Sequence, residues 1–109
     1  MKTSEILSAA KKLIETPDKW TKGAFGRTSE GHYRQFPEEV KDAVCWCAGG
    51  AIKMIAPNFS DTELAWQMFE RAVGIFSIPP WNDSEFRTHD EVMAGFDKAI
   101  ALARSEEGG

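Results

Sequence analysis

Residues 88–103, THDEVMAGFDKAIALA, carry the clearest indication of the fold. Thr88 and Glu91 have the spacing of a capping box, in which each side chain binds the backbone amide of the other residue at the start of a helix. The apolar residues that follow recur every three or four positions and form one stripe: Val92, Phe96, Ala99, Ile100 and Ala103. The segment therefore predicts an amphipathic helix that packs against the rest of the molecule.

Working outward, three further segments have helical periodicity, and each ends at a helix-breaking residue: 4–15 before Pro17, 38–56 before Pro57, and 60–73 before Gly74. The second of these follows Pro37, a residue suited to the first turn of a helix. The third begins with Ser60 and Glu63, which again have the capping-box spacing. Four main helices are therefore expected.

Two long segments, 17–36 and 75–87, lack this periodicity. A twenty-residue loop in a compact domain is usually functional, or else contains a short hairpin. In the second loop, residues 78–83 (IPPWND) are expected to form an extended arm that leads into a polar turn. The predicted fold class is all-α, a compact bundle of about four helices with two long ordered loops. One domain covers residues 1–109, with a frayed tail at 105–109.

The charge balance limits the classes of partner. The net charge is −4, but residues 1–55 carry nine Lys or Arg against seven acidic residues, and residues 56–109 carry four against ten. An acidic protein of this kind is not typical of dedicated nucleic-acid binders. No stretch approaches the ~20 apolar residues that span a membrane, so a cytoplasmic location without a membrane partner is expected.

The two cysteines, Cys45 and Cys47, do not have zinc-ligand spacing, and on a helix they would point away from each other. We therefore expect no metal and no cofactor. Cys47 lies between two apolar stripes of its predicted helix, which is typical of a buried thiol. The alternative is a catalytic role, with Cys47 as the nucleophile, His89 as its base and Asp83 orienting the imidazole.

A run of small residues, Ala48-Gly49-Gly50-Ala51, falls within the second predicted helix. Each glycine costs about 1 kcal/mol of helix stability relative to alanine, so a close approach should compensate for it. The expected neighbour is another helix or a large ring from one of three residues: Trp20, Trp66 or Trp81. The floor of a ligand site is the alternative.

The densest polar stretch is 81–89, WNDSEFRTH. Asn82 and Asp83 suit a turn, and Asp83 is close enough in sequence to pair with Arg87. These residues are expected to form a hinge that sets how the last helix enters the core. Alternatively, Arg87 and His89 receive an anionic ligand near the start of that helix.

Residues 19–27, KWTKGAFGR, alternate cations with aromatic residues. Such a pattern can clamp single-stranded nucleic acid. It also arises where Trp20 and Phe25 anchor a loop while Lys19, Lys22 and Arg27 face water. The acidic balance of the whole chain favours the anchoring interpretation.

Three motifs occur in order: Trp20-x-Lys22-Gly23-Ala24-Phe25, Trp46-Cys47-Ala48-x-Gly50-Ala51, and Trp81-Asn82-Asp83 followed by Arg87-Thr88. With them, the chain resembles an uncharacterised family of small bacterial and phage proteins, a domain of unknown function. The resemblance implies one compact domain and a bacterial or phage origin, and it implies no activity.

These observations favour a non-enzymatic binding module for a protein or small-molecule ligand, as a phage or bacterial accessory protein. The expected binding residues come from the first and third motifs: Trp20, Lys22, Trp81, Asn82, Asp83 and Arg87. The alternative is a small hydrolase or transferase that uses Cys47 and His89.

Overall fold

The computed structural model describes residues 1–108, apart from the side chains of Pro37 and Glu38. Within them the chain forms five α-helices: α1 (Thr3–Leu13), α2 (Ala48–Ile55), α3 (Phe59–Val73), α4 (Ile78–Asp83) and α5 (His89–Gly108). Two 3₁₀ helices, η1 (Pro17–Lys19) and η2 (Pro37–Asp42), and three strands, β1 (Gly26–Arg27), β2 (Tyr33–Arg34) and β3 (Cys45–Trp46), complete the described elements. None of the described helices is long and apolar enough to cross a membrane.

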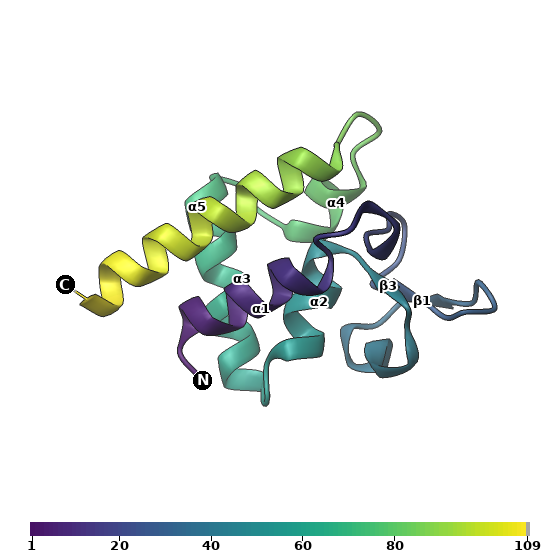
Figure 1. Cartoon of the computed structure of the whole chain (residues 1–109), viewed down its shortest axis with the longest axis horizontal. Helices are drawn as coiled ribbons and strands as arrows, with labels where there is room; N and C mark the ends of the chain where they lie inside the picture. Colours follow the sequence, from purple (N-terminus) through teal and green to yellow (C-terminus); the bar gives the residue numbers. More distant parts are fainter. Residues whose placement is uncertain (109) are drawn as a thin grey trace.

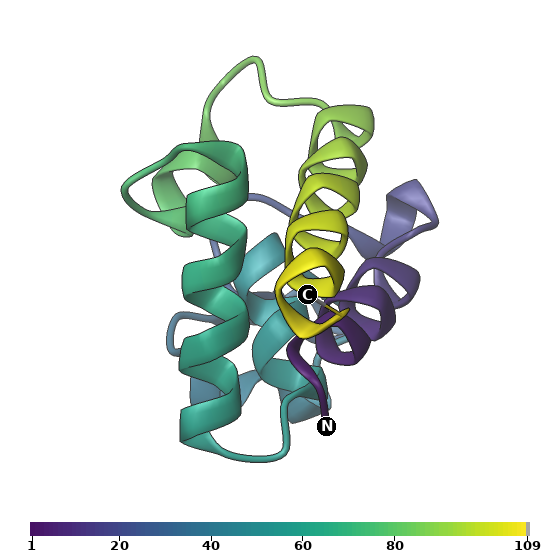
Figure 2. The ribbon, with the colours of Figure 1, turned by 90° about the vertical axis from the view of Figure 1, so that its left-hand side faces the viewer.

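The core lies where α5 packs across α1 and α3, as Figures 1 and 2 show. The predicted stripe of α5 faces this core, and all five of its residues are buried. Phe96 from that stripe meets Phe69 of α3 edge to face, with ring centroids 4.9 Å apart. The capping box is also confirmed, because Thr88 N donates to Glu91 Oε1 (2.9 Å) and Glu91 N donates to Thr88 Oγ1 (3.2 Å).

The helices predicted at 4–15 and 60–73 are present, but the start of α3 differs from the prediction. Asn58 caps this helix, and its Oδ1 accepts a hydrogen bond from Asp61 N (2.9 Å). The cap expected at Ser60 is therefore wrong, because Asn58 offers a favourable cap two residues earlier. Gly74 ends the helix as predicted, in the left-handed conformation (φ 78°).

The single helix predicted over 38–56 is wrong. The chain forms η2, then an extended segment with β3, and only then α2. The backbone of this extended segment bonds to the 20–27 loop: Val44 N donates to Arg27 O (2.8 Å), and Trp46 O accepts from Thr21 N (3.0 Å). Pairing with a distant segment thus replaces the helical hydrogen bonds that local periodicity favours.

The loop 17–36 contains the short hairpin that we considered as an alternative. β1 pairs antiparallel with β2 and with β3, which gives the order β2-β1-β3. Gly26 is opposite Arg34 on one side and Trp46 on the other. The sheet lies at the end of the molecule away from the C-terminus (Figure 1). The fold is therefore mostly helical, and the purely all-α prediction is wrong.

The segment Ile78–Asp83, expected to be extended, is the short helix α4. Its two prolines stand in the first turn, where a missing N–H breaks no helical hydrogen bond. One turn places Ile78 and Asn82 on the same face, and both are buried. Near the end of the chain, residues 105–108 of the expected frayed tail continue α5, and residue 109 lies outside the described residues. Glu107 accepts hydrogen bonds from Ser4 N (3.1 Å) and Ser4 Oγ (2.6 Å).

Candidate functional site

Asn82, fully buried on α4, joins the three sequence motifs. Its Oδ1 accepts hydrogen bonds from the indole Nε1 of Trp20 (2.7 Å) and the backbone N of Ala48 (3.0 Å). Its Nδ2 donates to Thr21 O (3.0 Å) and to Asp83 Oδ1 (3.0 Å). An asparagine side chain has two donors and two acceptor positions, so every one is used. Asn82 therefore holds the other motifs in place and has no capacity left for a ligand.

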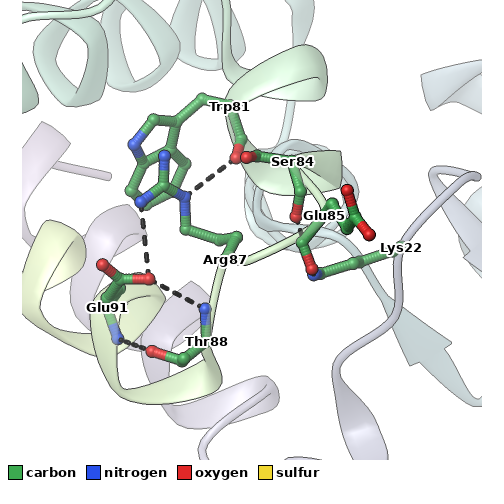
Figure 3. Close-up of polar contacts among 7 residues, drawn as sticks. All are labelled: Lys22, Trp81, Ser84, Glu85, Arg87, Thr88 and Glu91. Carbon is green, nitrogen blue, oxygen red and sulfur yellow. Dashed lines mark hydrogen bonds and ion pairs between the residues drawn. The ribbon is translucent and has the colours of Figure 1, made fainter.

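The neighbouring residues of α4 fix the first motif further. Asp83 Oδ1 also accepts from Gly23 N (2.9 Å), and Gly23 has a left-handed φ of 82°. Lys22 Nζ donates to the backbone oxygens of Ser84 (2.8 Å) and Glu85 (3.2 Å), as Figure 3 shows. Lys22 thus caps the carboxyl end of α4, the position at which a cation is favourable.

Arg87 does not pair with Asp83, so this prediction is wrong. Its Nε donates to Trp81 O (2.9 Å), its guanidinium lies over the Trp81 ring (4.3 Å to the centroid), and its Nη1 lies 3.5 Å from Glu91 Oε1 (Figure 3). The chain turns between α4 and α5. This turn directs the Arg87 side chain along the first turn of α5, towards the carboxylate of Glu91. Arg87 therefore fixes the entry of α5, as the hinge interpretation expects, but with other partners.

His89 is also engaged within the protein. Its Nε2 lies 2.7 Å from Ile14 O, and its ring lies 5.9 Å from that of Trp20, between ring centroids. The two residues proposed for an anionic ligand, Arg87 and His89, therefore already contact a carboxylate and a backbone oxygen.

Close approaches explain both glycines in the small-residue run. A Cβ at Gly49 would clash with the ring of Trp66, one of the three rings expected there. A Cβ at Gly50 would overlap the carbonyl oxygen of Phe25. The neighbour of Gly50 was not expected, because Phe25 approaches with its backbone, whereas the sequence suggested another helix or a large ring.

Cys47 is the N-cap of α2 and is 2% exposed. Its Sγ accepts a hydrogen bond from Gly50 N (3.2 Å). Burial raises the pKa of the thiol to about 12, and the Asp83 carboxylate contributes in the same direction. The thiol is therefore protonated at neutral pH. No hydrogen bond joins Cys47 to His89 among the described residues.

A cavity of about 150 Å³, which we call the motif cavity, lies where the motifs meet. It is lined by residues 23–25, Gln35, Cys47, Pro79 and Asp83. Of these lining residues, all within the described chain, Asp83 alone is charged at neutral pH. Two of the three candidate catalytic residues, Cys47 and Asp83, therefore share one cavity, whereas His89 does not line it.

A larger depression, of about 520 Å³, lies at the end of α3. It is formed by one continuous stretch, 67–76, and its wall includes Glu70, whose pKa is raised by burial. The motif cavity instead brings together four segments that are distant in sequence. No group of three or more His, Cys, Asp or Glu side chains that could hold a metal ion occurs in the part of the chain that the structure describes.

Comparison with known protein families agrees with the motif pattern. A model described as a family of unknown function, DUF6197, matches residues 1–102. The chain belongs to this family. Membership in an uncharacterised family, expected from the sequence, is thereby confirmed. No curated protein and no solved structure matches the chain.

In this DUF6197 chain, the site residues expected from the sequence include only Cys47 and Asp83 of the cavity wall and omit residues 23–25, Gln35 and Pro79. Residues 23–25 belong to the first motif, whereas Gln35 and Pro79 lie outside all three motifs. Gln35 follows β2, a strand that no periodicity indicated. Pro79 belongs to a helix that was expected to be an extended arm. Their positions depend on the hairpin and on α4. The short hairpin considered as an alternative for 17–36 was the one clue to the position of Gln35, because pairing within this segment brings Gln35 close to the first motif.

Proposed function

We propose that this protein is a non-enzymatic binding module and that the motif cavity is its binding site. The observation that carries the proposal is the convergence of four segments around a hollow with a single carboxylate, that of Asp83, in its wall. Ligand sites are typically apolar hollows with a few convergent polar groups. Asp83 contacts the ligand, while Trp20, Lys22 and Asn82 hold the loop that forms one wall.

The remaining proposed residues act at a distance from the ligand. Trp81 and Arg87 stack on each other and fix the turn after α4, which positions Asp83 through the helix. The partner class is a protein or a small molecule rather than nucleic acid, because the nearest cations are already used. Lys22 bonds two backbone oxygens, and Arg27 bonds Lys22 O (2.8 Å) and lies over the Tyr33 ring.

The resemblance of the three motifs adds the biological setting to this proposal. An accessory protein of a bacterium or a phage, acting in the cytoplasm, is the role that we propose. The two cysteines support an intracellular setting, because neither is in a disulfide and one is buried as a free thiol.

A matched pair of variants tests the site. Gln35→Trp places a large ring at the exposed rim of the motif cavity, and Gln67→Trp places the same ring in the wall of the depression at the end of α3. We expect a library of small alkyl and aromatic fragments to shift the amide resonances of residues 23–25 in the native protein. Gln35→Trp should abolish these shifts and Gln67→Trp should retain them. Shifts that survive in Gln35→Trp would place the binding site elsewhere.

A thiol-dependent hydrolase or transferase is the second candidate, because Cys47 and Asp83 line the same cavity. It has weaker support, since catalysis requires a thiolate and burial raises the pKa of this thiol. Alkylation with iodoacetamide at pH 7.5 discriminates the two functions, with the half-buried Cys45 as an internal control. We expect Cys45 to react first and Cys47 to react only on unfolding. Rapid labelling of Cys47 that is lost in His89→Ala would favour the enzyme.

A further inference from the structure

We propose that the motif cavity binds a small primary alkylamine, with its alkyl chain inside and its ammonium group at the rim against Asp83. The inference rests on the proposed function and names the ligand class of the same site. Three features carry it: the volume of the cavity, the order of its walls by depth, and the position of its one charge.

The volume sets the size of the ligand. Each water molecule occupies about 30 Å³ in the liquid, so about 150 Å³ holds about five non-hydrogen atoms. This is well below the roughly 300–1,000 Å³ of sites for drug-sized ligands. A chain of four carbons with one nitrogen therefore fits inside, whereas a nucleotide or a sugar could enter only in part.

The depth of the wall residues sets the orientation of the ligand. Ala24 and Cys47 are buried and form an apolar floor, with the Cys47 thiol protonated. Phe25 and Pro79 are half-buried and form the sides. The polar residues Gln35 and Asp83 are exposed and therefore lie at the rim, together with the backbone of Gly23. The ligand that matches this order has an apolar end that enters first and a polar end that stays at the surface.

The charge at the rim sets the polar end. Asp83 Oδ1 already accepts from Gly23 N and Asn82 Nδ2. A carboxylate has about four acceptor positions, so its second oxygen can receive an ammonium N–H, which is a charge-assisted hydrogen bond. The nearby cations do not line the cavity: Lys22 Nζ is directed to two carbonyl oxygens, and Arg27 donates to Lys22 O. An ammonium group therefore meets the carboxylate without displacing an internal partner.

The same geometry separates a free amine from a lysine side chain of a partner protein. Both have a four-carbon chain that ends in an ammonium group. A lysine that fills the cavity would have to enter with its charge first, which would place the ammonium on the apolar floor formed by Ala24 and Cys47. Removing a charge from water in this way is strongly unfavourable. The free amine instead buries its methyl end.

The test is a titration of the native protein, followed by amide chemical shifts at pH 7. The probes are n-butylamine, n-butanol and butyrate, which share a chain and differ in charge. We expect n-butylamine to shift the amides of Gly23 and Phe25 in a saturable manner, with a dissociation constant at least tenfold lower than that of either other probe. Nα-acetyl-lysine methylamide should bind at least tenfold more weakly than n-butylamine.

Two variants test whether the Asp83 carboxylate causes the preference for n-butylamine. Asp83→Asn retains an oxygen that can accept from Gly23 N and Asn82 Nδ2, and it should lose the preference for n-butylamine over n-butanol. Glu85→Gln removes a neighbouring exposed charge that does not line the cavity, and it should retain the preference. Should Asp83→Asn fail to fold, the salt dependence of binding to the native protein tests whether the preference for n-butylamine is electrostatic. Raising NaCl from 50 to 500 mM should weaken binding of n-butylamine and leave n-butanol unaffected.

Three outcomes would overturn the inference or its basis. Equal binding of n-butanol or butyrate would show that the cavity binds small molecules without selecting an ammonium group, which overturns this inference and leaves the proposed function intact. Tighter binding of the lysine derivative would overturn the orientation. If no probe and no library fragment shifts residues 23–25, both this inference and the proposed function fail.

Discussion

At the scale of single residues, Asn82 is the most informative position in the molecule. A buried polar side chain is tolerated when its hydrogen bonds are satisfied, and Asn82 satisfies four with groups from three segments. From the sequence, Asn82 was expected to form a turn and was also a candidate binding residue. Its burial against Trp20 and Ala48 supports a structural role, and Asp83 is the neighbouring group at the surface.

We expect Asn82→Ala to lower the free energy of unfolding by about 3 kcal/mol or more. The substitution leaves Trp20 Nε1, Ala48 N and Thr21 O without their partner, and each buried unsatisfied group costs about 1–3 kcal/mol. Urea denaturation measures the change. The control is Asn58→Ala, which removes an exposed helix cap and should cost about 1 kcal/mol. Equal losses in the two variants would contradict the role of Asn82.

At the scale of elements, the segment between η2 and α2 shows how tertiary contacts override local periodicity. Its apolar spacing favours one long helix, and the two glycines lower the stability of such a helix. Extended backbone at Cys45–Trp46 gains pairing with β1 and allows Cys47 to cap a shorter helix. The glycines then stand in the first turns of α2, where the backbone of Phe25 and the ring of Trp66 approach.

Gly50→Ala should destabilise the protein, although alanine is the better helix former by about 1 kcal/mol. The added methyl group would overlap the carbonyl oxygen of Phe25, a backbone atom that cannot move without shifting the first motif. We expect a net loss of about 1–3 kcal/mol, which is typical of overpacking. Gly108→Ala is the control, because no atom lies within 4 Å of its Cβ position. Thermal unfolding of both variants measures the difference, and a stabilised Gly50→Ala variant would exclude the close approach.

At the scale of the whole molecule, contacts between distant parts of the sequence hold the helices together. α5 crosses α1 and α3 (Figure 2). Buried apolar residues join α5 to these helices, and so do two ion pairs at the surface: Lys11 to Asp97 (2.7 Å) and Arg71 to Glu106 (2.8 Å). The pair between Lys11 and Asp97 joins the basic first half of the sequence to its acidic second half. Glu107 completes this arrangement by accepting hydrogen bonds from the first turn of α1.

The contact between Glu107 and Ser4 predicts a specific dependence on pH. Hydrogen bonds from the Ser4 hydroxyl and backbone amide lower the pKa of Glu107 below its ordinary value. The stabilisation is therefore present above the pKa of the unfolded state and is lost as the pH falls through the lower pKa of the folded state. We expect native protein to be more stable than Glu107→Gln at pH 6, and the difference to shrink towards pH 3. Urea denaturation at both values measures it.

Glu63→Gln is the matched control for this dependence. Its carboxylate is exposed on α3 and lies 3.5 Å from Gln67 Nε2. The difference between Glu63→Gln and the native protein should change less between pH 6 and pH 3 than that of Glu107→Gln, because Glu107, unlike Glu63, accepts hydrogen bonds from Ser4. If the difference for Glu107→Gln changes no more than that of the control, the contact between the two ends of the chain does not contribute to stability.

Local sequence patterns are sufficient to predict α1, α3 and α5, the capping box at Thr88 and the stop at Gly74, because these depend on neighbours within one or two helical turns. Packing in three dimensions instead sets the sheet, the break before α2, the helix at Ile78–Asp83 and the partners of Arg87. For the sheet, the break and the short helix, a hydrogen bond or a close approach from a distant segment competes with the local preference and prevails. Arg87 instead contacts Trp81 and Glu91, four to six residues away, because the chain turns between α4 and α5. The motif cavity also depends on contacts between distant segments. Its walls come from four segments, and no pattern within any one of them specifies that Asp83, Cys47 and Gln35 surround one hollow.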